Sequence, residues 1–285
     1  MVSSCLFSAA LFSALAAAQK CNLQFDGRLP KDLVAADLDV TNDFFDPNNV
    51  LGKGLKVSQV SRILPAGAGG LFDEGVEAQP VEVLISDASI FNDQVGFRRS
   101  ELLPASNDGS DPSTQGVKTV HFSVKKDNVR LLNLTHEYQL FFLESQDFST
   151  NQVVLKTGTI LGQNTPDPDT LQLFGNVNDN PPQLLFSTKF LPDTFNNFAL
   201  TLDFDKLTTQ VFFSTGLDPL KQVTDVLKND VSGQGQFHFG VLKKGLNGVG
   251  DITKNGEQEA GINEGIAYGG IFEEDSADGC VSLSP

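Results

Sequence analysis

The chain has 285 residues, and 36 acidic against 20 basic side chains give it a net charge of −16 at pH 7. This charge argues against nucleic acid and anionic membrane surfaces as partners, and it is compatible with neutral or basic polymers. The length is ample for a large hydrophobic core, and 40% of the residues are hydrophobic.

The first 18 residues predict a secretory signal peptide. Residues 6–18 are almost wholly apolar or small and end in the run Ala16-Ala17-Ala18, which suits a signal-peptidase site. The alternative, a membrane anchor, needs about 20 apolar residues, and this run is shorter. We therefore expect a secreted, extracellular protein that does not bind membranes, with residues 19–285 forming a single domain.

The cysteines agree with secretion. Cys5 leaves with the signal peptide, and Cys21 and Cys280 remain near the two ends of the mature chain. An oxidising compartment permits a bridge, which we expect, while two free thiols are the alternative. Two cysteines form no metal-binding cluster, and we expect neither a metal nor a cofactor. Asn133 begins an Asn-Leu-Thr sequon and is expected to carry a glycan, although short sequons also occur by chance.

The remaining pattern predicts strands almost throughout. Short runs rich in Val, Phe, Leu and Thr are separated by clusters of Gly, Asn, Asp and Pro. These runs cover residues 81–85, 97–104, 118–124, 136–142, 153–157, 198–204, 209–214 and 236–241. One short helix is expected over 218–227. Such a pattern is typical of an all-β fold, a β-jelly roll or concanavalin-like sandwich.

Several of these strands carry a polar face. Arg99 and Glu101 point to one side of their strand because successive side chains alternate. The strands around His121, Glu137 and His238 show similar polar stripes. We expect the strands of Glu101, His121 and Glu137 to be neighbours in one concave sheet face that forms an open substrate cleft. This face explains the polar stripes, and it would bring His121 and His238 together. The alternatives are solvated histidines, an ion pair of Glu101 with Arg98 or Arg99, and an exposed Glu137; Glu144 is expected at the surface.

Paired carboxyl groups of this kind suit glycoside cleavage. One carboxyl group protonates the leaving oxygen, and a carboxylate acts opposite it. Neighbouring arginines would hold Glu101 ionised, so Glu101 is predicted to be the base or nucleophile and Glu137 the acid. The residues expected to bind substrate are Arg98, Arg99, His121, Tyr138, Gln139 and His238.

Six segments together resemble a fungal secreted glycoside hydrolase of family 131. They are residues 23–28, 96–104 (Gly-Phe-Arg-Arg-Ser-Glu-Leu-Leu-Pro), 134–139, 198–205, 236–244 and 265–272. The resemblance implies a β-jelly roll with an open cleft and β-glucanase activity on β-1,3, β-1,4 and β-1,6 glucans. It also implies two catalytic glutamates, which map best onto Glu101 and Glu137. The chain departs from the family in having no Trp, with Phe195 and Asn196 where Trp and His are expected.

Two other classes of protein stay open. A polysaccharide lyase on a jelly roll also uses an Arg-x-Glu strand beside His and Tyr, with Arg98 or Arg99 neutralising a uronate carboxylate. The strong negative charge weakens that interpretation. The third possibility is a glucan-binding lectin without catalysis. For all three we expect a monomer that binds β-glucan or a similar polysaccharide.

Overall fold

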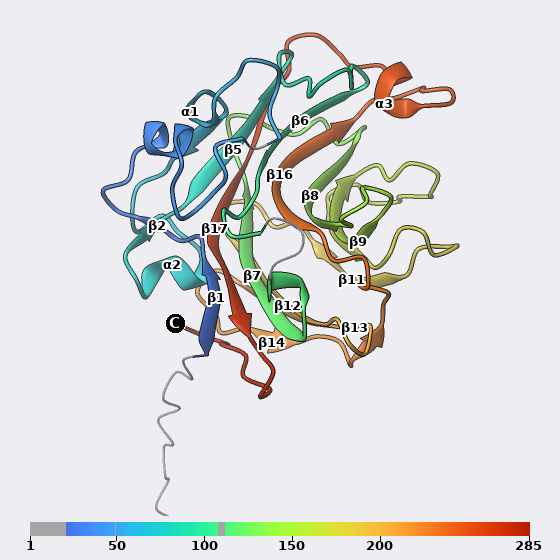
Figure 1. The fold of residues 1–285 in the computed structure, drawn as a ribbon. Coiled ribbons are helices and arrows are strands. Elements are labelled where there is room, and N and C mark those ends of the chain that lie inside the picture. Colours follow the sequence, from blue (N-terminus) through green and yellow to red (C-terminus); the bar gives the residue numbers. More distant parts are fainter. Residues whose placement is uncertain (1–20, 49, 108–111) are drawn as a thin grey trace, which may run out of the picture.

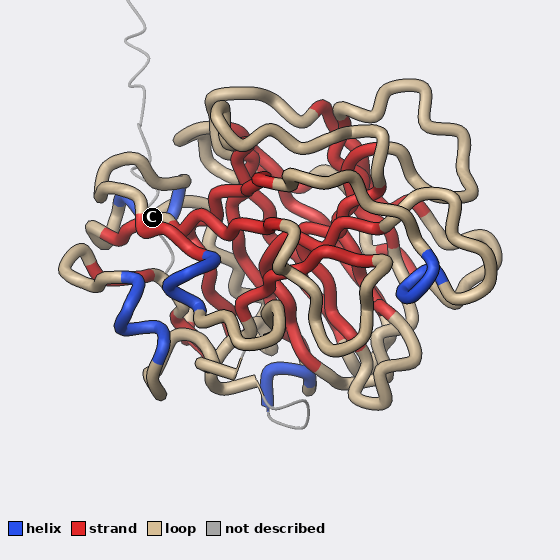
Figure 2. The backbone as a smooth tube through the Cα atoms, turned by 90° about the horizontal axis from the view of Figure 1, so that it is seen from above, coloured by secondary structure: helices blue, strands red, loops and turns tan. Residues whose placement is uncertain are grey.

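Two antiparallel β-sheets pack face to face in the computed structural model, which describes residues 21–48, 50–107 and 112–285 (Figure 1). The predicted signal peptide lies outside these residues. The strands lie in the centre of the molecule, and the short helices lie around them (Figure 2). This arrangement confirms the all-β sandwich, with a jelly-roll architecture.

Seven strands of the nine-stranded sheet follow one another in space in the order β14 (Lys221–Gln222), β13 (Thr208–Thr215), β12 (Asn196–Asp203), β7 (Val117–Lys126), β17 (Asn263–Asp275), β5 (Val81–Ser86) and β3 (Ser61–Ile63). The other two are β1 (Asn22–Asp26), which pairs with β17, and β15 (Leu227–Lys228), which pairs with β13. The six-stranded sheet contains β11 (Leu184–Lys189), β10 (Thr170–Phe174), β9 (Asn151–Gly158), β8 (Glu137–Glu144), β16 (Gln236–Lys244) and β6 (Phe97–Leu102).

The smaller elements are β2 (Leu29–Pro30), which pairs with β4 (Ala78–Gln79), the helices α1 (Val57–Val60), α2 (Leu71–Glu74) and α3 (Ile252–Asn255), and the 3-10 turns Ala35–Asp39 and Pro112–Thr114. None of the helices in the described part of the chain is long and apolar enough to cross a membrane.

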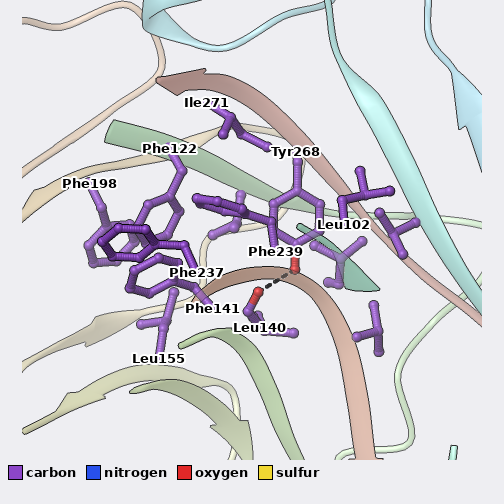
Figure 3. Packing of buried hydrophobic residues seen from close by; sticks show 14 of the residues in the cluster. Leu102, Phe122, Leu140, Phe141, Leu155, Phe198, Phe237, Phe239, Tyr268 and Ile271 are labelled. Carbon is purple, nitrogen blue, oxygen red and sulfur yellow. Dashed lines mark hydrogen bonds between the residues drawn. The ribbon is translucent and has the colours of Figure 1, made fainter. Parts of the chain in front are cut away.

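Phenylalanines fill much of the space between the two sheets (Figure 3). Phe122 of β7 stacks on Phe141 of β8 with their ring centroids 4.4 Å apart, which joins one sheet to the other. Phe198 and Phe239 extend this cluster. Because alternate residues of each strand face this layer, the polar residues between them face outward.

Two bulges interrupt the six-stranded sheet next to one another. The register of β8 shifts between Gln139 and Phe141, and that of β16 shifts between Phe239 and Leu242. The hydroxyl group of Tyr268, which comes from the other sheet, lies 2.8 Å from the carbonyl oxygen of Leu140 (Figure 3) and 2.6 Å from that of Gly240. Its single proton is donated to one of these two carbonyl groups at a time, at the bulges where regular pairing is lost.

The bulge in β8 changes which side chains face outward. Both Leu140 and Phe141 point into the core, whereas Phe142 packs on the opposite face with Phe97 and Val154. Glu144 therefore lies on the outer face of the six-stranded sheet, the face turned away from the nine-stranded sheet.

Two expectations about elements are wrong. Residues 218–227 form no helix: Lys221 and Gln222 pair with Phe213 and Phe212 of β13 instead, so pairing with the edge of the sheet prevails over local helix preference. The strand β7 also belongs to the nine-stranded sheet, so it is not a neighbour of β6 and β8, which both flank β16.

The predicted disulfide is confirmed. Cys21 and Cys280 are bonded, with their Cα atoms 5.6 Å apart and a sequence separation of 259. The bridge lies beside the β1–β17 pair and ties the two ends of the domain together.

Candidate active site

The first component of the site is an ion pair on the edge strand β6. The guanidinium group of Arg99 donates two hydrogen bonds to Glu101, from Nε at 2.7 Å and from Nη2 at 2.6 Å. Two residues apart on a strand, both side chains point to the outer face. The side chain of Glu101 is fully buried, and this burial raises its pKa, but Arg99 and His238 outweigh the effect and hold the pKa below its usual value. Glu101 is therefore an anion.

His238 of β16 connects this pair to a second carboxylate. Its Nδ1 lies 2.8 Å from Oε2 of Glu101, and its Nε2 lies 3.4 Å from Oε2 of Glu144. The imidazole ring stacks on Phe142 with centroids 4.3 Å apart. Burial lowers the pKa of His238, but its contacts with Glu101 and Glu144 outweigh burial and raise it. The imidazolium form is thus favoured between two carboxylates.

The ring also fixes the spacing of the two carboxylates. Because Glu101 and Glu144 contact opposite nitrogens of one imidazole, their nearest oxygens lie on the order of 8 Å apart. Carboxyl pairs of inverting glycosidases are separated by roughly 6.5–9.5 Å, and those of retaining enzymes by about 5–5.5 Å. Here the imidazole ring of His238 occupies the space between the two carboxyl groups, so this spacing does not by itself assign inversion or retention.

Exposure increases along this chain of contacts. The side chain of Glu101 is 0% exposed, that of His238 is 2% exposed and that of Glu144 is 24% exposed. Glu144 is thus the member that solvent or a ligand reaches first, whereas Glu101 is held in the interior.

A glycine makes the close approach of β6 and β16 possible. Gly240 pairs with Glu101. A Cβ atom at Gly240 would lie 2.2 Å from the carbonyl oxygen of Ser100 and 2.5 Å from Cα of Glu101. Both contacts are to backbone atoms, which cannot move aside separately from the strand, so only glycine fits here.

Glu137 belongs to a different cluster. Its Oε1 forms ion pairs with Lys156 at 3.0 Å and Lys244 at 2.8 Å, and its Oε2 accepts a hydrogen bond from the backbone nitrogen of Leu161 at 2.9 Å. Burial raises the pKa of Glu137, but the two lysines and this backbone bond lower it by more than burial raises it. The net pKa is therefore below its usual value, and the carboxyl group is ionised. An ionised carboxylate paired with two lysines is poorly suited to donate a proton.

The register also separates Glu137 from Glu101. Glu101 pairs with Gly240, whereas Tyr138 pairs with Lys243, which places Glu137 about four residues, or roughly 13 Å, farther along β16. The catalytic pair Glu101 and Glu137 stays a prediction that no contact supports. The structure instead brings Glu101 together with Glu144.

The other residues predicted to bind substrate lie in several places. Gln139 lies on the outer face, where its Oε1 accepts a hydrogen bond from Asn151 at 3.0 Å. Arg98 turns away from Arg99 and donates to the carbonyl oxygens of Val95 and Phe97.

Tyr138 and His121 are remote from this face. Tyr138 is fully buried between the sheets, and its hydroxyl group donates to Glu264 at 2.7 Å, which leaves no ring surface for a sugar. His121 is fully buried on the outer face of the nine-stranded sheet, where it bonds to Glu274 at 2.9 Å and stacks on Phe272. The expectation that His121 and His238 share a cleft is therefore wrong, because their strands lie in different sheets.

The sequence predicts Glu144 at the surface, and regular alternation does not reveal its contact with His238. Counted from Glu137 in steps of two, Glu144 falls on the opposite face of the strand. The four apolar residues 140–143 in a row equally fit a strand that is apolar on both faces, and Phe142 does pack in an apolar cluster on the outer face, so the sequence does not reveal the bulge.

Two further predictions concern metals and the sequon. Among residues 21–48, 50–107 and 112–285, no group of three or more His, Cys, Asp or Glu side chains is arranged to hold a metal ion. Asn133 is partly exposed, its Nδ2 donates to Glu259 at 2.9 Å, and its Oδ1 accepts from the hydroxyl group of Thr135 at 2.8 Å. Glycosylation of Asn133 stays a prediction.

Comparison with known proteins identifies the family. The glycoside hydrolase 131 catalytic N-terminal domain matches residues 23–279. A solved structure of a GH131 beta-glucanase catalytic domain from Podospora anserina superimposes with a TM-score of 0.71 at 23% identity, covering 92% of this chain and 98% of that one. The catalytic domain of the family 131 protein from Coprinopsis cinerea gives a TM-score of 0.69 at 22% identity, covering 93% and 98%. No curated protein matches. Since the family match spans most of the sequence, this chain belongs to glycoside hydrolase family 131.

Proposed function

We propose that this chain is a secreted enzyme that hydrolyses β-glucans, with Glu101 and Glu144 as its two carboxyl groups. The observation that carries the proposal is the imidazole ring of His238, which contacts one carboxylate on each side. Membership of the family supports glycoside hydrolysis, and a similar structure is that of a beta-glucanase. The net charge of −16 suits a neutral glucan better than an acidic polysaccharide.

The two carboxyl groups would take different roles. Glu101 is held ionised, so it is the base that accepts a proton from the attacking water. A carboxylate accepts about four hydrogen bonds. Arg99 and His238 together occupy three of these positions, and the fourth would take a water molecule enclosed beside Glu101, because this side chain is 0% exposed. Glu144 is the acid that protonates the leaving glycosidic oxygen.

Substrate binding would prepare Glu144 for this role. Its side chain is partly exposed, and a sugar lying over it would displace solvent from its carboxyl group and bring the glycosidic oxygen within its reach. The water then attacks the anomeric carbon while the bond to the leaving oxygen breaks, and the protonated leaving group departs. His238 orients both carboxyl groups. We extend the proposal to β-1,3, β-1,4 and β-1,6 linkages, which an outer sheet face could accept in several orientations.

Secretion is part of the proposal for two reasons. Residues 1–18 have the pattern of a signal peptide, and the bond between Cys21 and Cys280 requires an oxidising compartment to form.

Product analysis on a panel of β-1,3, β-1,4 and β-1,6 glucans tests the proposal. The enzyme should release reducing sugars without an ultraviolet-absorbing unsaturated product, and Glu101→Gln should lower turnover about 100-fold or more. Thermal unfolding of Glu101→Gln separates lost chemistry from lost folding. An unsaturated product would indicate a lyase, and binding without sugar release would indicate a lectin; either result contradicts hydrolysis.

A further inference from the structure

A polar surface pocket lies at the end of the six-stranded sheet next to Glu144. It is formed where β8 and β10 end and where β9 and β16 begin, and its volume is about 650 Å³. That volume is within the range of roughly 300–1,000 Å³ found for small-molecule sites. Hydroxyl, amide and carboxylate groups line it, among them Ser145, Asp147, Gln152, Asn176, Asp179 and Asp230.

Buried hydrogen bonds build this pocket in advance. The fully buried Gln152 donates to the carbonyl oxygen of Gln234 at 2.6 Å and accepts from the backbone nitrogen of Gly233 at 2.7 Å. Asn176 accepts from Thr150 at 2.8 Å and donates to the carbonyl oxygen of Asp230 at 2.9 Å. Three separate loops are therefore held in one arrangement, and a ligand need not order them.

The pocket is also joined closely to the candidate active site. Ser145, which lines the pocket, directly follows Glu144. The backbone of Gly235 approaches so near that a Cβ atom there would lie 1.8 Å from the carbonyl oxygen of Glu144. Gly235 has a φ of +103°, a conformation that favours glycine. The pocket thus lies at the end of β8, directly after Glu144 in sequence, while the Glu144 side chain itself lies outside its lining.

An exposed aromatic residue stands on the same loop. Phe148 lies between the pocket residues Asp147 and Ser149, and it is 73% exposed. Its φ of +59° is a strained conformation for a residue with a bulky side chain. Asp147 maintains the turn by accepting hydrogen bonds from the hydroxyl groups of Ser145 and Ser149, both at 2.7 Å. Strain of this kind is found where a side chain is held for a function.

We propose that the pocket and Phe148 together form a sugar-binding subsite for the part of a β-glucan chain that extends beyond Glu144. The inference rests on the proposed function, which it deepens by naming where the chain lies. Hydroxyl groups of the sugar would donate to Asp147, Asp179 and Asp230. The apolar C–H face of a glucose ring would pack on the electron-rich face of Phe148, a contact usually made by Trp, which this chain lacks.

Binding of a β-glucose hexasaccharide with sulfur linkages, which resist hydrolysis, tests this subsite by calorimetry. The β-1,3-linked and β-1,4-linked forms are both used with the intact enzyme. Phe148→Asn removes the ring and puts in a residue that tolerates positive φ. The free energy of unfolding should be kept or raised, whereas the dissociation constant of the hexasaccharide should increase about tenfold. Phe148→Tyr should bind as the parent protein does.

Leu217→Ala provides the matched control, because Leu217 is a 61% exposed apolar residue in the turn after β13 of the other sheet. Unchanged binding by Phe148→Asn, equal loss by Leu217→Ala, or no binding by the parent protein would overturn the subsite. These outcomes are separate from hydrolysis. If the parent enzyme cleaves glucan and Phe148→Asn has no effect on binding, only the subsite is refuted. If the parent enzyme binds the hexasaccharide through Phe148 but releases no sugar from glucan, only the catalytic proposal is refuted.

Discussion

At the scale of single residues, the site depends on charges that are buried only because they are paired. Glu101 would be costly to bury alone, and Arg99 and His238 provide the compensating bonds. The same bonds favour the charged forms, since they lower the pKa of Glu101 and raise the pKa of His238. Folding and chemistry therefore rely on the same contacts here.

Removing Arg99 tests this dependence. Arg99→Met should lower the free energy of unfolding by about 3–5 kcal/mol, because it leaves a buried carboxylate without its main partner. Urea unfolding at neutral pH measures the change. Arg98→Met is the neighbouring control: Arg98 donates only to backbone carbonyl groups, so its loss should cost about 1 kcal/mol. Similar losses from the two substitutions would show that the pair with Glu101 contributes little.

At the scale of strands, the bulges determine which carboxylates meet. The alternation of residues 137–144 predicts the strand β8, and it places Glu137 and Gln139 on the outer face as observed. It fails after the bulge, where Glu144 moves to the face that carries Glu101 and His238. The local sequence pattern predicts where a strand lies. A shift of one residue in its register, however, moves every following side chain to the other face of the sheet.

Pairing between distant strands was also beyond the sequence pattern. The runs around His121 and His238 look alike, yet one lies in each sheet. Which strands pair depends on the packing of the whole core, such as the stacking of Phe122 on Phe141 across the layer. The match of Cys21 with Cys280 was predictable because only two cysteines remained.

Gly240 tests the strand pairing at the site. Gly240→Ala should force β16 from β6 and displace Glu101, with a loss of about 1–3 kcal/mol in the free energy of unfolding and a loss of activity. Gly265→Ala on β17 is the control, since the Cβ atom there would first meet the end of the Leu84 side chain, which can move. Thermal unfolding and turnover of both variants decide the point. Equal losses of stability and turnover in the two variants would mean that the close approach of β6 and β16 at Gly240 is not required.

At the scale of the whole molecule, acidic groups make stability depend on pH. The net charge of −16 produces repulsion that decreases toward pH 4.4, the isoelectric point of the sequence. Burial raises the pKa of Asp73 to about 6, against the backbone bonds from Gly270 and Gly70. Burial and the neighbouring Asp127 likewise raise the pKa of Glu82 to about 7.

The free energy of unfolding should therefore be larger at pH 5.5 than at pH 7.5. An Asp side chain in the unfolded chain has a pKa of about 3.9, so between about pH 4 and 6 the folded state binds more protons, and stability rises as pH falls. Asp73 contributes about 1 kcal/mol to the change between pH 7.5 and pH 5.5, and about 3 kcal/mol over the whole range down to pH 4. The pKa values of Glu101 and Glu137 are lowered in the folded state, so their contribution to the free energy of unfolding is lost only below about pH 4.5.

Urea unfolding across this range measures the effect, and Asp73→Asn, which does not titrate, should show a shallower dependence on pH. Stability that is flat or decreases toward pH 5.5 would contradict the assignment of Asp73 as a buried, raised carboxyl group.

The central claim is that Glu144, and not Glu137, works with Glu101, and the turnover of Glu144→Gln and Glu137→Gln on one β-glucan tests it most directly. Glu144→Gln should lose about 100-fold or more in turnover with nearly unchanged unfolding, because Glu144 is partly exposed. Glu137→Gln should unfold more easily, since Lys156 and Lys244 lose their partner, while the folded enzyme keeps its turnover. An inactive but folded Glu137→Gln beside a fully active Glu144→Gln would contradict the claim and restore Glu101 with Glu137 as the catalytic pair.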